Sequence, residues 1–214
     1  PRRQRLRLVD ELRDKGISDE RVLAAISRVP RHLFVEPALR ARAYRDEALP
    51  IGLKQTISQP FTVAYQTMVM NVRRDDTILE IGTGSGYQAA ILCELGARVY
   101  SIERHKPLLD RTRALLDRLG YRIVTRHGDG TLGWEAFAPY DGVVVTAGAL
   151  EIPDALLAQL RVPDNQTRGG RLIIPLGDDR GQIMNRIDRE DANQFKRQRL
   201  DSFRFVPLIG GNAR

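Results

Sequence analysis

The stretch that decides the fold is LEIGTGSGY, residues 79–87. The apolar residues of TILEI (77–81) predict a short buried strand that ends at Ile81, and YQAAIL predicts a helix that begins near Tyr87. The turn between them contains three glycines: Gly82, Gly84 and Gly86. Glycines allow the backbone to approach a ligand closely and leave the N-terminus of the helix facing it. The stretch therefore predicts a strand, a turn and a helix that together hold a small ligand.

The same alternation of strand and helix continues along the chain. The strand-like runs RVYSIE, YRIVTRHGD, YDGVVVTAG and GGRLIIPLG alternate with the helix-like KPLLDRTRALLDRLG and IPDALLAQL. Such alternation predicts an α/β fold with a mostly parallel twisted sheet and helices on both faces. QIMNRIDRE and KRQRLDSFRFVPLIG come next with no helix between them, which predicts an antiparallel hairpin at the sheet edge.

The composition limits the classes of protein to consider. With 214 residues and 42% hydrophobic content, the chain can form one globular domain. Its single cysteine, Cys93, excludes a disulfide framework and fits a reducing, cytoplasmic compartment. No apolar run approaches the roughly 20 residues of a membrane helix, so we expect no membrane partner. Neither a histidine pair nor a carboxylate cluster indicates a metal, so we expect none.

The net charge of +7 allows nucleic acid as a partner without requiring it. Basic residues cluster in 2–13 and 186–204, but acidic residues interrupt both clusters. This pattern favours a solvated charged face, with a nucleic-acid footprint as the alternative.

The glycine turn fits one class of cofactor better than another. Counted from Gly82, the last glycine of the dinucleotide fingerprint G-x-G-x-x-G would fall on Tyr87, which argues against NAD or FAD. An acid followed by x-G-x-G-x-G resembles the first motif of S-adenosylmethionine-dependent methyltransferases with a Rossmann-like fold. Glu80, the acid before the turn, then engages the amino-acid end of the cofactor. A purely structural turn is the alternative.

The ends of the next two predicted strands strengthen this interpretation. Glu103 ends the second strand, where its two oxygens can accept hydrogen bonds from two ribose hydroxyls, although a solvated surface glutamate is the alternative. Asp129 comes directly after the third strand, in RHGDG, and with nearby backbone amides suits the adenine edge.

Two stretches of sequence indicate the acceptor of the methyl group: the end of the fourth strand and QTISQP (55–60). Enzymes that methylate amino groups commonly carry N/D-P-P-Y/F after the fourth strand, where this chain reads VVVTAGAL. A carboxylate is nucleophilic without further activation and needs only hydrogen-bond donors that hold it in line. Ser58, close before the expected helix start at Pro60, can position such a carboxylate. The alternative role for Ser58 is a helix N-cap.

Several segments together resemble the protein-L-isoaspartate O-methyltransferase family over nearly the whole chain: VLAAISRVPRHLFV, ALPIG, QTISQP, LEIGTGSGYQAAIL, RHGDG, PYDGVVVTAG, IPDALLAQL, GGRLIIPLG and FRFVPLIGG. The resemblance implies a repair enzyme that uses S-adenosylmethionine to esterify the free carboxylate of isoaspartyl residues in damaged proteins and peptides. It implies Ser58 as the catalytic residue and 205–209 as a segment that closes the site. The predicted cofactor-binding residues are Thr56, Ile57, Ser58, Glu80, Gly82, Thr83, Gly84, Ser85, Glu103, Arg104, Gly128, Asp129 and Gly130.

The resemblance also defines the expected organisation of the chain. We predict one methyltransferase domain, 1–214, composed of an N-terminal helical extension (1–50), an acceptor-site loop and helix (51–76), a cofactor-binding core (77–177) and C-terminal strands (178–214). We expect a cytoplasmic monomer. Two features depart from the family pattern: Leu53 and Lys54 before QTIS, and a long stretch at 161–170 that we expect to form a surface loop. The alternatives are a methyltransferase of RNA or of a small molecule, and a non-catalytic module of the same fold.

Overall fold

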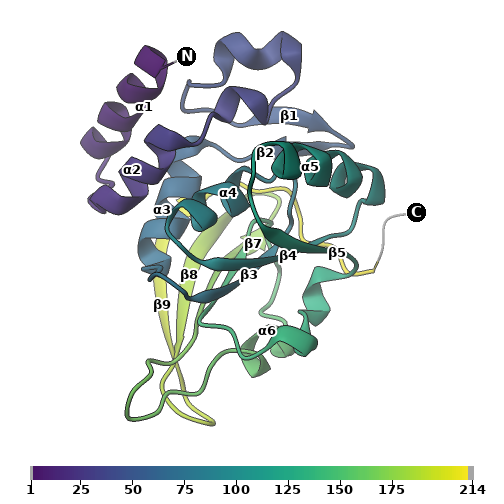
Figure 1. Ribbon diagram of the computed structural model, residues 1–214. Coiled ribbons are helices and arrows are strands. Elements are labelled where there is room, and N and C mark those ends of the chain that lie inside the picture. Colours follow the sequence, from purple (N-terminus) through teal and green to yellow (C-terminus); the bar gives the residue numbers. More distant parts are fainter. Residues whose placement is uncertain (1, 212–214) are drawn as a thin grey trace.

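A seven-stranded sheet with the strand order β5-β4-β3-β6-β7-β8-β9 forms the centre of the computed structural model, which describes residues 2–211 (Figure 1). Strands β3 to β7 run parallel to one another, β8 pairs antiparallel with β7, and β9 pairs antiparallel with β8. The strand bounds are Thr77–Ile81 (β3), Arg98–Glu103 (β4), Ile123–His127 (β5), Gly142–Val145 (β6), Arg171–Asp178 (β7), Gly181–Arg189 (β8) and Phe195–Phe203 (β9). The predicted parallel core and the edge hairpin are both confirmed.

Helices cover both faces of this sheet (Figure 1). On one face, Ile78 of β3 packs in a cluster with residues of α3 and α4; on the other, Leu79 and Ile81 pack in a cluster with Leu156 of α6. The side chains of β3 alternate between the faces because successive residues of a strand point in opposite directions. The helix bounds are Pro60–Met70 (α3), Tyr87–Glu94 (α4), Lys106–Arg118 (α5) and Asp154–Ala158 (α6), with short 3-10 turns at Gly130–Leu132 (η3) and Glu135–Phe137 (η4).

The N-terminal residues form a further helical layer over α3, α4 and α5. It contains Arg2–Asp14 (α1), Glu20–Arg28 (α2), Arg31–Leu33 (η1) and Pro37–Arg42 (η2). Buried leucines of α1 and α2 join one core with Tyr87 and Ile91 of α4. The side chain of Asp19 caps the N-terminus of α2 by accepting a hydrogen bond from the Arg21 amide at 2.9 Å.

A small antiparallel hairpin, β1 (Leu49–Gly52) and β2 (Gln55–Ile57), joins this layer to α3. Its turn places Leu53 and Lys54 at φ angles of 51° and 58°. A positive φ is unfavourable for residues with a side chain, so Leu53 and Lys54 carry backbone strain at this turn.

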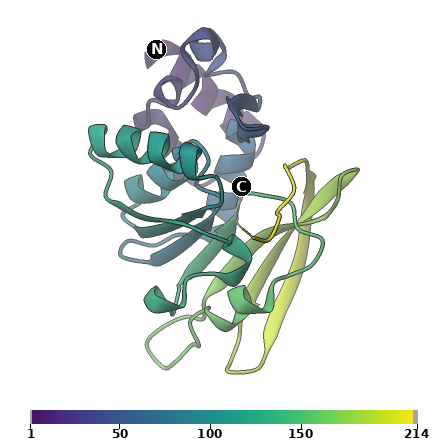
Figure 2. The same cartoon turned by 90° about the vertical axis from the view of Figure 1, so that its right-hand side faces the viewer.

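Two long segments outside the sheet lie on the surface. Residues 161–170 contain no helix or strand and are exposed or half-buried apart from Gly170, as expected of a surface loop. Residues 204–211, the C-terminal strap, follow β9 and cross back to the carboxyl end of β6, as the yellow segment of Figure 2 shows. Two hydrogen bonds hold it against the loop after β6, from the Gly148 amide to the Val206 carbonyl at 2.8 Å and from the Leu208 amide to the Gly148 carbonyl at 2.7 Å.

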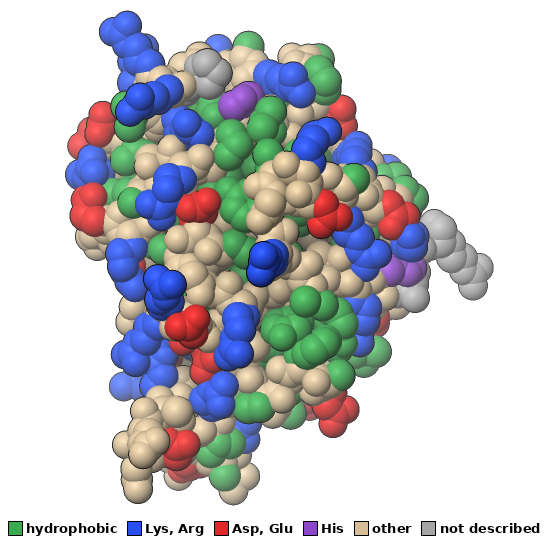
Figure 3. Space-filling model, in the orientation of Figure 1, with side chains coloured by type: hydrophobic (Ala, Val, Ile, Leu, Met, Phe, Trp, Pro, Cys, Tyr) green, Lys and Arg blue, Asp and Glu red, His purple; other side chains and the backbone are tan. Residues whose placement is uncertain are grey.

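The second basic cluster of the sequence lies on the edge hairpin. Lys196, Arg197 and Arg199 are exposed on β9, the last strand of the sheet, and Figure 3 shows basic side chains along this edge, on the lower left, with acidic ones among them. Charged side chains on an edge strand oppose pairing with another chain, which accounts for this cluster without nucleic acid. Within residues 2–211, no helix has the length and the apolar character needed to cross a membrane.

Candidate active site

The glycine turn brings the backbone close to the end of the sheet. Gly82 has a φ of 95°, and a Cβ atom at this position would lie 2.5 Å from the hydroxyl oxygen of Thr146. That hydroxyl contacts the carbonyls of Ile81 and Gly82, at 2.9 and 2.8 Å. The absence of a side chain at Gly82 therefore allows the loop after β6 to pack directly against the turn.

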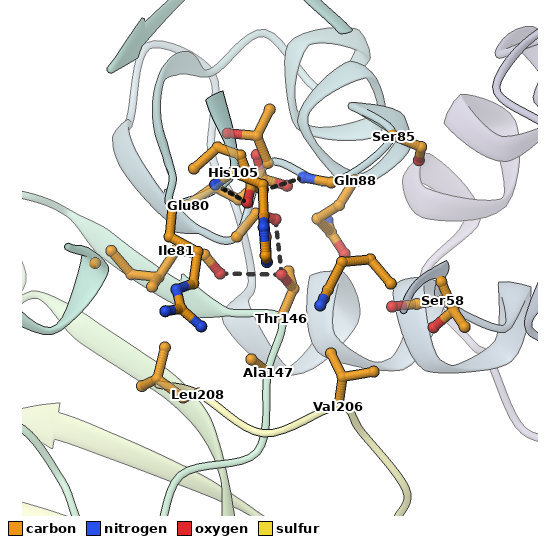
Figure 4. A pocket seen from close by; sticks show the side chains of 18 of the residues that line it. Ser58, Glu80, Ile81, Ser85, Gln88, His105, Thr146, Ala147, Val206 and Leu208 are labelled. Atoms are coloured by element: carbon orange, nitrogen blue, oxygen red, sulfur yellow. Dashed lines mark hydrogen bonds between the residues drawn. The ribbon is translucent and has the colours of Figure 1, made fainter. Parts of the chain in front are cut away.

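A pocket opens where this turn meets the carboxyl ends of β3, β4 and β6 (Figure 4). We call it the inner pocket. Its walls consist of residues 55–58, 80–85, 87–88, 102–105, 130, 146–147 and 206–209, together with Val63. The carboxyl ends of parallel strands are the usual place for a ligand in a fold of this kind.

Glu80 forms a buried acidic point in the wall of the inner pocket. Its side chain is fully buried, and Oε2 accepts a hydrogen bond at 2.5 Å from Ser101, its direct neighbour on β4. Its Oε1 has no hydrogen-bond partner in the part of the chain that is described. Burial raises the pKa of Glu80 to about 8, so the carboxyl group is mostly protonated at pH 7, and a cation in the pocket would favour its ionised form.

Glu103 holds the glycine turn from the end of β4. Its Oε2 accepts a hydrogen bond from the Gly84 amide, and its Oε1 accepts one from the His105 amide, both at 2.9 Å. Each carboxylate oxygen can accept a second hydrogen bond, so the side chain can still bind two hydroxyl groups of a ligand. With only 5% of its surface exposed, Glu103 is not the solvated glutamate of the alternative interpretation.

A second cavity, the outer groove, lies beside the inner pocket. Its walls consist of residues 48, 56, 58–59, 61–62, 146, 180–183 and 202–206, from α3, the edge hairpin and the C-terminal strap. The two cavities share four lining residues: Thr56, Ser58, Thr146 and Val206. A group bound in one cavity can therefore meet a group bound in the other beside Ser58.

The structure separates Ser58 from the capping of α3. The N-cap residue is Gln59, which makes no side-chain capping bond, so the N-cap alternative for Ser58 is wrong. The buried carboxylate of Asp46 serves this helix end instead, since it accepts hydrogen bonds from the Phe61 amide at 2.7 Å and from Gln59 Nε2 at 3.0 Å. Capping by a distant residue leaves the Ser58 hydroxyl available at the junction of the two cavities.

The cofactor-binding residues predicted from the sequence lie around one pocket, with two exceptions. All of them line the inner pocket apart from Gly128 and Asp129. Asp129 accepts hydrogen bonds from the amide and hydroxyl of Thr131, at 2.9 and 2.7 Å, and from the Gly211 amide at 2.5 Å. Its carboxylate thus caps η3 and holds the C-terminal strap.

Sequence reasoning missed several residues of the inner pocket. The polar ones are Gln55, Gln88, His105 and Thr146. A polar residue in the first turn of the helix after the glycine turn would have been a usable signal for Gln88. Thr146 follows directly after the fourth strand, where enzymes that methylate amino groups carry their binding motif, and this position could have identified it as a candidate.

Comparisons with known proteins agree on one family. The family model described as protein-L-isoaspartate(D-aspartate) O-methyltransferase matches residues 3–213. A protein-L-isoaspartate O-methyltransferase of Salinibacter ruber is 64% identical over 212 residues, which is 97% of this chain and 92% of that protein. One of Flavobacterium psychrophilum is 50% identical over 214 residues, covering 98% and 96% of the two chains.

Solved structures agree with the sequence comparisons. A protein-L-isoaspartate O-methyltransferase superposes with a TM-score of 0.84 at 27% identity, covering 96% of this chain and 66% of that longer one. A structure from Plasmodium falciparum, described as the same kind of enzyme in complex with S-adenosyl-L-homocysteine, superposes with a TM-score of 0.81 at 24% identity. It covers 96% of this chain and 98% of its own, and it supports the fold.

Proposed function

The chain belongs to the protein-L-isoaspartate(D-aspartate) O-methyltransferase family, and on this premise we propose how its two cavities divide the reaction. It is an S-adenosylmethionine-dependent carboxyl O-methyltransferase that transfers a methyl group to the free carboxylate of isoaspartyl residues in proteins. The observation that carries the division of roles is the junction of the inner pocket and the outer groove at Ser58.

The inner pocket is the cofactor site in this proposal. Glu103 has free acceptor capacity on both oxygens for ribose hydroxyls, and Glu80 has an unpartnered oxygen for the amino-acid end. Two buried carboxyl groups match a ligand that carries a sulfonium and an ammonium group and no phosphate. The glycine turn lets this ligand lie against the backbone.

The outer groove receives the isoaspartyl segment of the protein substrate. Its lining contains Arg180 and Arg204 and no acidic residue, and Asp178, outside the groove, forms an exposed ion pair with Arg180 at 2.7 Å. This charge distribution suits a substrate whose reacting group is a carboxylate, because opposite charges guide and retain it.

Ser58 positions the acceptor where the two cavities meet. S-adenosylmethionine, when bound, supplies an electrophilic methyl group on sulfur. The Ser58 hydroxyl donates a hydrogen bond to the acceptor carboxylate and orients one oxygen along the line of displacement. The Thr146 hydroxyl bridges two backbone carbonyls, so it keeps the wall of the junction in place. Val206, from the C-terminal strap, reduces the access of water.

The remaining parts of the proposal concern the setting of the enzyme. We expect a cytoplasmic monomer. Burial raises the pKa of its single cysteine, Cys93, to about 12, which makes the thiol unreactive. Nucleic acid is not expected as a partner, because ion pairs with acidic neighbours occupy Arg171 and Arg186, on the edge hairpin side of the sheet.

A methyl-transfer assay with paired peptides tests this function. The two peptides differ only in an isoaspartyl or an aspartyl linkage at one position. We expect a base-labile methyl ester on the isoaspartyl peptide and far less product on the other. A product that survives mild alkali, or a label on added RNA, contradicts the proposed acceptor. Binding of S-adenosyl-L-homocysteine without any transfer indicates a non-catalytic module.

A further inference from the structure

Gln88, like Glu80, lines the inner pocket and has a buried side-chain oxygen without a partner in the described part of the chain. It lies in the first turn of α4, is only 6% exposed, and lines the pocket. We propose that the Gln88 side-chain oxygen, together with Glu80, binds the ammonium group at the amino-acid end of the cofactor. This inference rests on the proposed function, since it assigns one group of the expected ligand to one corner of the pocket.

The hydrogen bonds around Gln88 determine which atom of its amide faces the ligand. Its nitrogen lies 2.9 Å from the hydroxyl oxygen of Thr67. That hydroxyl lies 2.7 Å from the Val63 carbonyl, which can only accept, so the hydroxyl hydrogen is already donated there. Thr67 can therefore only accept from Gln88, and its partner must be the amide nitrogen. The oxygen of Gln88 is left without a partner in the described part of the chain.

Glu80 presents the same kind of atom on the same pocket. Its Oε2 is occupied by Ser101, and its Oε1 has no partner within residues 2–211. A buried acceptor without a donor costs free energy, so each of these oxygens would gain from a donor that the ligand supplies. In the view of Figure 4, Gln88 projects between Glu80 and Ser58.

The chemistry of the two atoms selects the ligand group. The Gln88 oxygen can only accept hydrogen bonds, and a cation in the pocket favours the ionised form of Glu80, in which both of its oxygens accept, so the two side chains together favour a cationic donor over a carboxylate or a phosphate. An ammonium group carries three donors and a positive charge, and it can donate to both oxygens at once. The hydroxyl groups of the ligand have their own acceptors at Glu103. The alternative occupant is a water molecule that bridges the two oxygens.

Two ligands separate the ammonium assignment from a general effect on the pocket. S-adenosyl-L-homocysteine carries the amino-acid end, whereas 5′-methylthioadenosine has the same nucleoside and thioether without it. We would measure both dissociation constants by calorimetry for the wild-type protein and for Gln88→Leu. We expect the variant to bind S-adenosyl-L-homocysteine about 10-fold more weakly, or worse, because a hydrogen bond to a charged group is lost. Its affinity for 5′-methylthioadenosine should stay within about 2-fold of the wild type, since this ligand has no ammonium group.

Gln66 supplies a matched control. It is 1% exposed, donates from its nitrogen to the Val145 carbonyl at 2.9 Å, and has an oxygen without a partner in the described chain, but it does not line the inner pocket. Gln66→Leu should change the thermal midpoint without changing either dissociation constant. Gln88→Met, which keeps an unbranched side chain, replaces Gln88→Leu if that variant does not fold.

The outcomes decide between distinct possibilities. If Gln88→Leu weakens the binding of both ligands equally, the inference is overturned, because Gln88 then supports the pocket as a whole. Unchanged binding of both also overturns it and assigns the two oxygens to water. If the wild-type protein binds neither ligand, the proposed cofactor site itself fails, which is a result separate from the role of Gln88.

Discussion

The inner pocket and the outer groove adjoin each other and share Ser58, yet they are built in different ways. The inner pocket gathers the ends of β3, β4 and β6 and contains the buried carboxyl groups of Glu80 and Glu103. The outer groove combines α3, the edge hairpin and the C-terminal strap, and its charged residues are two exposed arginines. The cavities therefore differ in the burial of their charged groups, and only the inner pocket is lined by carboxyl groups.

This difference matches two ligands of opposite charge. A buried carboxyl group interacts strongly with a cation because little water screens it, so the inner pocket can select a small ligand through a few groups. Exposed arginines act weakly and over a longer range, which suits the reception of many different protein substrates. Changes in the inner pocket should thus have large effects on cofactor binding, and changes in the outer groove small effects on substrate use.

The largest effect is expected from Gly82→Ala. A methyl group there would meet Thr146 at 2.5 Å on a backbone with a φ of 95°. We expect S-adenosyl-L-homocysteine affinity to fall by about 100-fold or more, measured by calorimetry. Gly120→Ala is the control, because Gly120 has a φ of 79° and open space around its Cα. It should cost about 1–2 kcal/mol of stability with normal affinity. Equal affinity losses in the two variants would mean that strain, and not the collision, matters.

Ser58→Ala tests the junction of the two cavities. We expect turnover to fall by about 10- to 100-fold, because one hydrogen bond to a charged acceptor is lost, while cofactor affinity and the thermal midpoint stay nearly normal. Asp46→Ala is the comparison, since it removes the cap of α3 and should lower stability by about 1 kcal/mol. A normal rate in folded Ser58→Ala would end the catalytic assignment. A methylated enzyme intermediate in the wild type would instead make Ser58 a nucleophile.

Glu103→Ala tests the ribose end of the inner pocket. The change removes charge-assisted hydrogen bonds to the ligand and the bonds to the Gly84 and His105 amides. We expect about 10- to 100-fold weaker binding of S-adenosyl-L-homocysteine, and a similar loss for 5′-methylthioadenosine, which keeps the ribose. Titration calorimetry with both ligands measures this, and a selective loss of one ligand would contradict the ribose assignment.

Glu80 should make cofactor binding depend on pH. Because burial raises its pKa in the folded state to about 8, above the ordinary value of 4.5, the folded protein binds an extra proton between these values. Stability of the free protein should therefore fall as pH rises through this window. A bound ammonium group favours the ionised form, so affinity for S-adenosyl-L-homocysteine should rise several-fold from about pH 6 to about pH 8. Glu80→Gln should remove this rise, and a pH-independent affinity in the wild type would contradict it.

The smallest effect concerns the arginines of the outer groove. We expect isoaspartyl peptides with flanking glutamates to have KM values about 2- to 5-fold lower than peptides with flanking glutamines, and the difference should shrink in high salt. Arg180→Gln and Arg204→Gln should each reduce the preference. Arg199→Gln makes the same change of charge on β9 outside the groove and should leave it intact. If the double variant, Arg180→Gln with Arg204→Gln, still prefers peptides with flanking glutamates, the two arginines do not contribute to substrate recognition.

Much of the inner pocket was predictable because its parts are short and local. The glycine turn, Glu80 and Glu103 each stand at the end of a strand with a clear apolar pattern, and parallel strands bring their ends to one edge. The boundaries of β3 at Ile81 and of α4 at Tyr87 agree with the predictions. Asp129 shows the limit of this reasoning. It also follows a strand of the parallel sheet, but this position does not determine whether its side chain faces the pocket or, as observed, the C-terminal strap.

The residues that the sequence did not reveal depend on contacts between distant segments. Asp46 caps α3 across 15 residues, and only that contact shows that Ser58 is not needed as a cap. The amide of Gln88 is oriented by Thr67, 21 residues away on another helix. The outer groove has no counterpart in any single stretch of sequence, because it joins 48–62 to 180–206.

The sequence by itself determined the layered α/β fold, the position of the glycine turn and the resemblance to one family, because these depend on local periodicity and on contiguous motifs. The tertiary structure decided which side chains face the ligand, which oxygens of the described residues remain unpartnered, and where the two cavities meet. These depend on the packing of segments that are far apart in the chain, and hydrogen bonds such as those of Asp46 and Gln88 exist only once that packing has formed.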